Sequence, residues 1–209
     1  MNPLHTDIIG LMPHDIHHTT NPFATFADFP QGVAFEGQEK GEKIILLLRA
    51  HLITLVPRVF TIIFLLILPF FAPFILGLSG IDLAGFLSAA QTFLIVVFWY
   101  LFTFGFALYR FIFWYFNVYL LTNERVVDFD FKGLLHKETA YAKLNQVQDV
   151  SPKMIGFFGT FFHYGDVFIQ TAAERPEFEF HKVPRPNDVA EEILRQVRIE
   201  EAEKPGEVK

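Results

Sequence analysis

The longest uncharged stretches of this chain are VFTIIFLLILPFFAPFILGLSGI at residues 59–81 and LAGFLSAAQTFLIVVFWYLFTFGFALY at residues 83–109. They contain 23 and 27 residues, and Asp82 between them is the only residue from 59 to 109 that is charged at neutral pH. Because a bilayer core of about 30 Å needs about 20 apolar residues in a helix, each stretch is long enough to span a membrane. The sequence therefore predicts two transmembrane helices and excludes an ordinary soluble domain.

The two helices are expected to form a hairpin, because only residues 79–85 connect them. Pro69 and Pro73 lie four residues apart inside the first helix, and each removes a backbone hydrogen bond, so a kink is predicted there. The connection contains no Lys or Arg, whereas basic residues flank both outer ends of the hairpin at Lys40, Lys43, Arg49, Arg58, Arg110 and Arg125. The positive-inside rule then predicts a multi-pass protein of the inner membrane, with both termini in the cytoplasm.

The flanks of the hairpin carry residues that suit the headgroup region. Residues 44–58 mix apolar side chains with basic ones, which favours an interfacial helix before the first span. An aromatic run follows the second span. The membrane-interface anchors predicted from these flanks are Arg49, Arg58, Arg110, Trp114 and Tyr115. We therefore expect residues 44–116 to comprise an interfacial segment and a transmembrane hairpin.

Composition excludes several classes of function. The chain has 17 Lys and Arg against 23 Asp and Glu, a net charge of −6 that argues against nucleic-acid binding. It has no cysteine, which rules out disulfides, thiolate catalysis and Cys-ligated metal centres.

Residues 117–198 differ from the hairpin and predict a small α+β domain. Polar and apolar residues alternate at 125–131 and 177–183, which is typical of half-buried strands. A helix is expected from Asn187 or Asp188, because Val189, Ile193 and Val197 recur every four residues. Residues 1–43 are expected to be an irregular tail that contains several phenylalanines, and residues 199–209 a disordered acidic tail.

Four blocks of sequence resemble the bacterial PH-like domain family, in its membrane-anchored form with a transmembrane helical hairpin. They are YLLTNERVV (119–127), KLNQVQDV (143–150), GFFGTFFHYGDV (156–167) and VPRPNDVAEEI (183–193). The resemblance implies a pleckstrin-homology-type β-barrel capped by a C-terminal helix, a prokaryotic membrane setting and no known enzymatic chemistry. The turn at 122–125 is expected to be structural, since Thr122 can bond locally and Asn123 favours a tight turn.

Two polar clusters are candidate sites of chemistry. The first, in a tail with no helix to fix its spacing, comprises His14, Asp15, His17 and His18. The second, on alternating strands and turns, comprises His163, Asp166, Glu177, Glu179 and His181. Neither cluster contains a recognised motif, so we expect no enzyme activity, no cofactor, no metal site and no small-molecule substrate.

The expected function is that of an interaction or scaffolding protein, whose partners are the lipid bilayer and a second protein or further copies of the chain. The predicted lipid or partner contacts are Arg125, Lys132, Lys137, Lys143, Phe157, Phe158, Phe161 and Phe162. One alternative is an oligomeric channel or export component, its pore lined by Thr61, Thr92 and Thr103 and the PH-like domains forming a cytoplasmic collar. Another is a binder of anionic lipid headgroups, although the basic residues are interleaved with acids.

Overall fold

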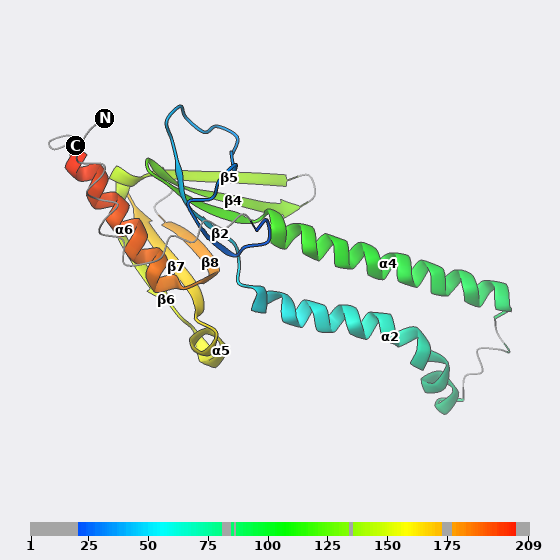
Figure 1. The fold of residues 1–209 in the computed structure, drawn as a ribbon. Helices are drawn as coiled ribbons and strands as arrows, with labels where there is room; N and C mark the ends of the chain where they lie inside the picture. Colours follow the sequence, from blue (N-terminus) through cyan, green and yellow to red (C-terminus); the bar gives the residue numbers. More distant parts are fainter. Residues whose placement is uncertain (1–20, 81–84, 86, 134–135, 173–176, 204–209) are drawn as a thin grey trace.

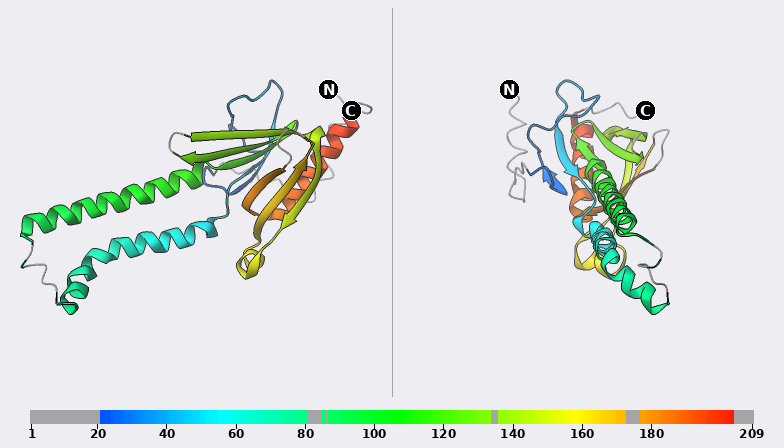
Figure 2. Two further views of the ribbon diagram at one scale, coloured as in Figure 1. Left: turned by 180° about the vertical axis from the view of Figure 1, so that it is seen from behind. Right: turned by 90° about the vertical axis from the view of Figure 1, so that its right-hand side faces the viewer.

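The computed structural model describes residues 21–80, 85, 87–133, 136–172 and 177–203. These residues form a two-sheet domain and two long helices, which leave one end of the domain side by side (Figures 1 and 2). Of residues 79–88, which connect the two helices, residues 81–84 and 86 lie outside the described residues.

The domain contains two antiparallel sheets. The first has the strand order β1-β2-β3-β4-β5, with β1 Phe26–Asp28, β2 Ile44–Leu48, β3 Val118–Thr122, β4 Arg125–Gly133 and β5 His136–Lys143. The second has the order β6-β7-β8, with β6 Val147–Lys153, β7 Tyr164–Thr171 and β8 Glu177–Pro184. A 3₁₀ turn, η2 (Leu144–Gln146), joins β5 to β6, and the short helix α5 (Gly156–Phe161) joins β6 to β7.

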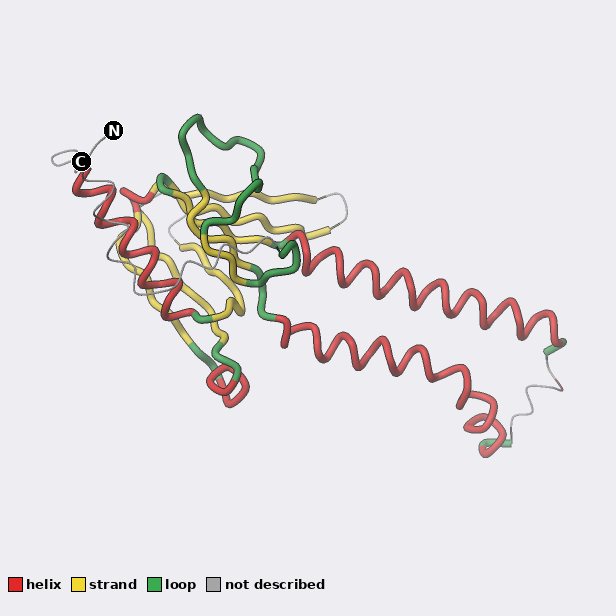
Figure 3. The backbone as a smooth tube through the Cα atoms, viewed as in Figure 1, coloured by secondary structure: helices red, strands yellow, loops and turns green. Residues whose placement is uncertain are grey.

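The helix α6 (Pro186–Glu203) packs on the second sheet, mainly on β6 and β7 (Figure 3). It buries Val189, Ile193 and Val197, the three residues whose spacing predicted the helix. The main core contains these side chains together with those of both sheets, among them Leu121, Val126, Ile169 and Phe180. The prediction of antiparallel strands followed by a C-terminal helix is therefore confirmed.

Two features of this domain differ from those predicted from the sequence. Among the described residues no strand pairing joins the two sheets, so they form two separate sheets where a closed barrel was expected. The helix α6 also continues to Glu203, whereas a disordered tail was expected from residue 199. Glu and Ala are good helix formers, which suits the helical conformation of Glu200, Glu201 and Ala202.

The two long helices are α2 (Val56–Leu78), preceded by the 3₁₀ turn η1 (Leu52–Leu55), and α4 (Ala89–Phe116). By length and composition both are apolar enough to cross a membrane. Pro57 lies in the first turn of α2, where its missing N–H costs no hydrogen bond. The start of α4 is fixed by a capping box, in which Ser88 and Gln91 each bond the other's backbone N–H.

The proline kink of α2 is stabilised by a side chain of α4. Pro69 has no N–H to donate to the carbonyl oxygen of Leu65, four residues earlier. The indole Nε1 of Trp99 donates to this oxygen at 2.8 Å, so the freed acceptor is satisfied. Beyond this point α2 bends away from the line of its first turns (Figure 1). The kink predicted from Pro69 and Pro73 is confirmed, and the neighbouring helix relieves it.

The prediction of an interfacial helix over residues 44–58 is wrong for residues 44–48. Ile44–Leu48 forms the strand β2, and all five of its residues are buried. Leu46 and Leu48 face the main core, whereas Ile44 and Leu47 belong to a second apolar cluster on the other side of the sheet. A strand that is buried on both faces shows no polar alternation, and a short apolar run of this kind cannot be assigned from periodicity.

The segment before β2 explains the phenylalanines of the N-terminal region. Phe35 packs on the second apolar cluster, which contains Leu120 and Val127, and Phe26 and Phe29 pack on the main core. The described part of the predicted tail, residues 21–43, therefore covers the outer face of the first sheet and supplies its edge strand β1. Residues 1–20, which include the histidine cluster at 14–18, lie outside the described residues.

Candidate functional site

Two buried side chains hold the domain to the helices. Arg49 is 8% exposed, and its guanidinium donates to the carbonyl oxygens of Tyr115 (2.9 Å), Pro22 (3.0 Å) and Ala24 (2.9 Å). Trp114 is 5% exposed, and its Nε1 donates to the carbonyl oxygen of Ala50 at 2.8 Å. These bonds cross between the end of α4 and the chain that enters α2, so both helices are fixed to the same sheet.

These contacts give two of the five predicted interface anchors a place within the fold. Arg49 and Trp114 are buried in the junction, and the ring of Tyr115 lies under the guanidinium of Arg49 at 4.8 Å. Arg58 and Arg110 lie at the domain ends of α2 and α4, where Arg110 contacts the rings of Phe106 and Tyr109. A role of these residues at the membrane interface stays a prediction.

A cavity of about 580 Å³ lies where the helices meet the domain. Arg58 and Arg110 of the helices line it, together with Lys182 of β8. The strands contribute acids to the same cavity, namely Asp128, Asp130, Glu177 and Glu179. Burial raises the pKa of Tyr119, another lining residue, well above its ordinary value, so this hydroxyl stays protonated. The cavity is therefore polar, with four acids against three Lys and Arg side chains and His181.

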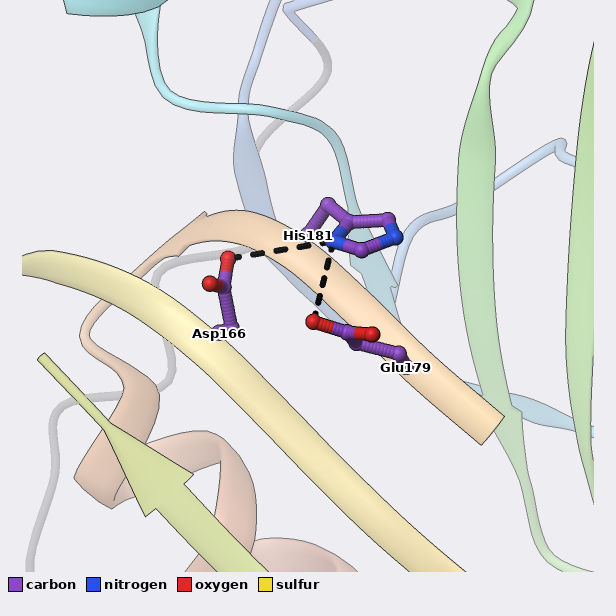
Figure 4. A group of neighbouring side chains, drawn as sticks. All are labelled: Asp166, Glu179 and His181. Carbon is purple, nitrogen blue, oxygen red and sulfur yellow. Dashed lines mark ion pairs between the residues drawn. The ribbon is translucent and has the colours of Figure 1, made fainter. Parts of the chain in front are cut away.

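In the wall of this cavity, which Glu179 and His181 line, the strands bring together Asp166, Glu179 and His181 (Figure 4). Glu179 and His181 are two apart on β8 and so project from the same face, and Asp166 lies on the adjacent β7. His181 Nδ1 is 3.2 Å from Glu179 Oε1 and 4.0 Å from Asp166 Oδ1. Of the residues considered from sequence as an acid–base set, Glu177 lines the cavity, and His163 lies apart at the start of β7.

This trio offers one nitrogen and two carboxylate oxygens within 4.8 Å of one another, a donor set that divalent zinc accepts. However, Asp166 Oδ1 already accepts a hydrogen bond from the backbone N–H of Lys182 at 2.7 Å. The side chain of His181 is also 60% exposed. The arrangement is a surface ion-pair cluster on a sheet, and its chemistry does not require a bound ion.

The predicted contact residue Arg125 is engaged within the domain. Its guanidinium donates to both carboxylate oxygens of Glu42, at 2.9 and 2.7 Å, and the side chain of Glu42 is fully buried. Thr122 donates to the same carboxylate at 2.8 Å and also accepts from the backbone N–H of Arg125 at 3.0 Å. The 122–125 turn is thus structural, as expected. Glu42 could not be identified from a local sequence pattern, because its partner Arg125 lies 83 residues further along the chain.

The remaining predicted contacts are more accessible. Lys137 forms an exposed ion pair with Glu36 at 2.9 Å, and Lys143 is exposed at the end of β5. The side chain of Lys132 lies outside the described residues. The four phenylalanines of the α5 region are all exposed to solvent, and Gly159 is the only buried residue of that helix. Among the described residues of the domain, no other segment has as many exposed aromatic rings.

Comparison with known proteins agrees with the two-sheet domain and its C-terminal helix. Residues 52–197, more than half of the chain, match the family model described as "Bacterial PH domain". No curated protein matches the chain. A solved structure from Shewanella loihica PV-4, a DUF1696 family protein with a pleckstrin-homology domain, is 14% identical over 39% of this chain and 68% of its own, with a TM-score of 0.28. At that TM-score the structure adds no argument, and the match of the family model is what identifies this chain as a member of the bacterial PH domain family.

Proposed function

We propose that this chain is a membrane-anchored interaction protein without enzymatic activity. In this proposal α2 and α4 cross the bilayer as a hairpin, and the PH-like domain and both termini lie in the cytoplasm. The domain then offers a binding surface, at a fixed height above the membrane, to a protein partner or to a second copy of the chain.

One observation carries the proposal. The strand that precedes α2 pairs directly with the strand that follows α4, with Leu47 opposite Leu120. The start of α2 and the end of α4 are therefore both attached to one folded sheet. If the two helices cross the bilayer, the residues before α2 and those after α4 must lie on the same side of the membrane. The clamp formed by Arg49 and Trp114 supports a fixed orientation of the domain on the hairpin. The basic flanks and the uncharged connection favour the cytoplasm as that side.

The edge strand β5 is the surface best suited to a protein partner. Among the described strands it pairs only with β4, so its outer backbone groups can bond an extended segment. Tyr141, two residues before the end of this strand, is 63% exposed. Lys137 and Lys143 near its ends are the kind of residue that prevents uncontrolled edge pairing. These features favour an edge that binds a chosen partner.

The structure favours this function over the channel. The hydroxyls of Thr61, Thr92 and Thr103 donate to carbonyl oxygens of their own helices, at 2.9, 3.2 and 2.9 Å. Thr103 is in addition 1% exposed. Hydroxyl groups engaged in this way are ordinary for helices in lipid and do not favour a polar pore lining.

The cavity at the junction does not favour binding of anionic headgroups. Its three Lys and Arg side chains are outnumbered by the four acids described above. A phosphate placed there would meet repulsion from the strand side as well as attraction from Arg58 and Arg110.

Photo-crosslinking in native membranes tests the interaction. A photoreactive amino acid at position 141 is expected to give a discrete adduct, and an adduct of twice 24.1 kDa would identify a second copy. The same group at Arg198, exposed on α6, is the matched control. Adducts that are absent at position 141, or equally frequent at both positions, would contradict the assignment of β5.

A further inference from the structure

The connection between β6 and β7 is an uncharged aromatic projection. Residues 154–162 (MIGFFGTFF), here called the aromatic knob, contain no charged side chain and lie between Lys153 and His163. The six residues of α5 form its centre. Figure 3 shows this short helix projecting beyond the ends of β6 and β7.

The aromatic knob contributes almost nothing to the core. Phe157, Phe158 and Phe161 are 76%, 62% and 64% exposed. The rings pack on one another instead, with stacked pairs at 5.9 Å (Phe157 and Phe161) and 6.4 Å (Phe158 and Phe162). Together they expose roughly 500 Å² of apolar surface, which is as large as the patches that mark interaction sites on monomeric proteins.

The base of the aromatic knob is attached to the base of α2. Tyr164, which follows the knob, stacks on the ring of His51 with centroids 5.5 Å apart. His51 caps the 3₁₀ turn that leads into α2, where its ring Nδ1 accepts from the backbone N–H of Ile53 at 3.1 Å. The backbone N–H of His51 donates to the carbonyl oxygen of Lys182. In both views of Figure 2, α5 lies close to the start of α2.

The backbone makes this attachment close. A Cβ on Gly165 would lie 2.5 Å from the carbonyl oxygen of Lys153, so the two strands that carry the knob approach where only glycine fits. The carbonyl oxygen of His163 also accepts from the N–H of Arg185, at 2.8 Å. The knob is therefore held beside the start of α2 by contacts from β6, β8 and the turn before α2.

We propose that the aromatic knob inserts its phenylalanine rings into the headgroup–acyl boundary of the leaflet that α2 enters. This inference rests on the proposed function, because it requires that α2 and α4 cross the bilayer. The occupant is lipid, since the uncovered rings lie next to the point at which the apolar surface of α2 begins. An uncharged aromatic cluster suits that depth of a bilayer. The knob thus gives the domain a third point of contact with the membrane.

The test uses the full chain, which has no cysteine, reconstituted in vesicles of phosphatidylcholine and phosphatidylglycerol. A polarity-sensitive fluorophore is attached at Phe158→Cys in the knob, at Phe104→Cys in the middle of α4, or at Glu191→Cys on the exposed side of α6. Nitroxide-labelled lipids then report depth. We expect quenching at position 158 by shallow nitroxides, quenching at 104 by deep ones, and at least fivefold weaker quenching at 191.

Each outcome separates the two proposals. Quenching at 104 with none at 158 overturns the lipid-inserting knob and leaves the proposed function standing. No quenching at either position overturns the proposed function itself. Quenching at 158 that is absent at high protein density and appears only as the protein is diluted in lipid would overturn lipid as the occupant and assign the knob to a second copy. In a further variant, Phe157→Gln combined with Phe161→Gln, quenching at 158 is expected to fall at least twofold while unfolding of the domain is unchanged.

Discussion

Arg49→Ala is expected to lower the free energy of unfolding of the domain by roughly 3–5 kcal/mol. The side chain is buried and bonds three carbonyl oxygens, which belong to the 21–25 segment and to the end of α4. Without the guanidinium, these acceptors lose their charged donor in a site that water cannot readily enter. Thermal unfolding of the purified protein in detergent, followed by circular dichroism, should show a midpoint about 10 °C lower.

Two further variants show whether geometry or charge matters at this position. Lysine keeps the charge, but its single ammonium cannot reach carbonyl oxygens on opposite sides of the junction. Arg49→Lys should therefore restore less than half of the stability that Arg49→Ala removes. Arg198 is exposed on α6, and Arg198→Ala should change stability by about 0.5 kcal/mol or less. An unfolding midpoint for Arg49→Ala equal to that of Arg198→Ala would mean that the junction is not held by this residue.

Glu42→Ala and Arg125→Ala are each expected to cost about 3–5 kcal/mol, because either change leaves a partly or fully buried charge without its partner. The double variant should cost much less than the sum of the two, which a double-mutant cycle measures directly. The exposed pair of Glu36 and Lys137 is the matched control, and its removal should cost about 1 kcal/mol or less. Additive costs at Glu42 and Arg125 would contradict a coupled pair.

The same pair predicts how stability depends on pH. Burial disfavours the charged carboxylate of Glu42, but hydrogen bonds from Arg125, from the backbone of Glu39 and from Thr122 outweigh it and hold its pKa below the ordinary value of 4.5. The unfolded chain therefore binds the proton first, so this stabilisation is complete above pH 4.5 and is lost as the pH falls through the lower, folded pKa. Glu42→Gln should flatten the pH dependence of the unfolding midpoint below pH 4.5.

The apolar helices and the C-terminal half of the domain could be predicted from sequence because their signals are local. A long uncharged run suffices for α2 and α4, alternation for β4 and β8, and a four-residue spacing for α6. The strand β2 could not be assigned in this way. Its five apolar residues look like the start of the first membrane helix, and only pairing with β3, some 70 residues later, makes them a strand.

The candidate site was predictable only in part, for a related reason. The phenylalanines of the α5 region are among the contacts predicted from the sequence, and they are uncovered in the fold. Arg49 and Arg125 were read as surface cations, because basic residues beside an apolar span usually lie in the headgroup region. Arg49 in fact bonds backbone carbonyls of the 21–25 segment and of the end of α4, and Arg125 bonds the carboxylate of Glu42. These partners are distant in sequence, so no local pattern reveals them.

The most direct test of the proposed topology is to determine on which side of the membrane each end of the hairpin lies. A cysteine is introduced either at Ser79, at the far end of α2, or at Arg198 on α6, both exposed in a chain that has no other cysteine. A membrane-impermeant maleimide is then added to intact spheroplasts. We predict that position 79 is labelled at once and that position 198 is labelled only after the membrane is permeabilised. Labelling of both positions from the outside, or of position 198 alone, would contradict a hairpin that anchors a cytoplasmic domain.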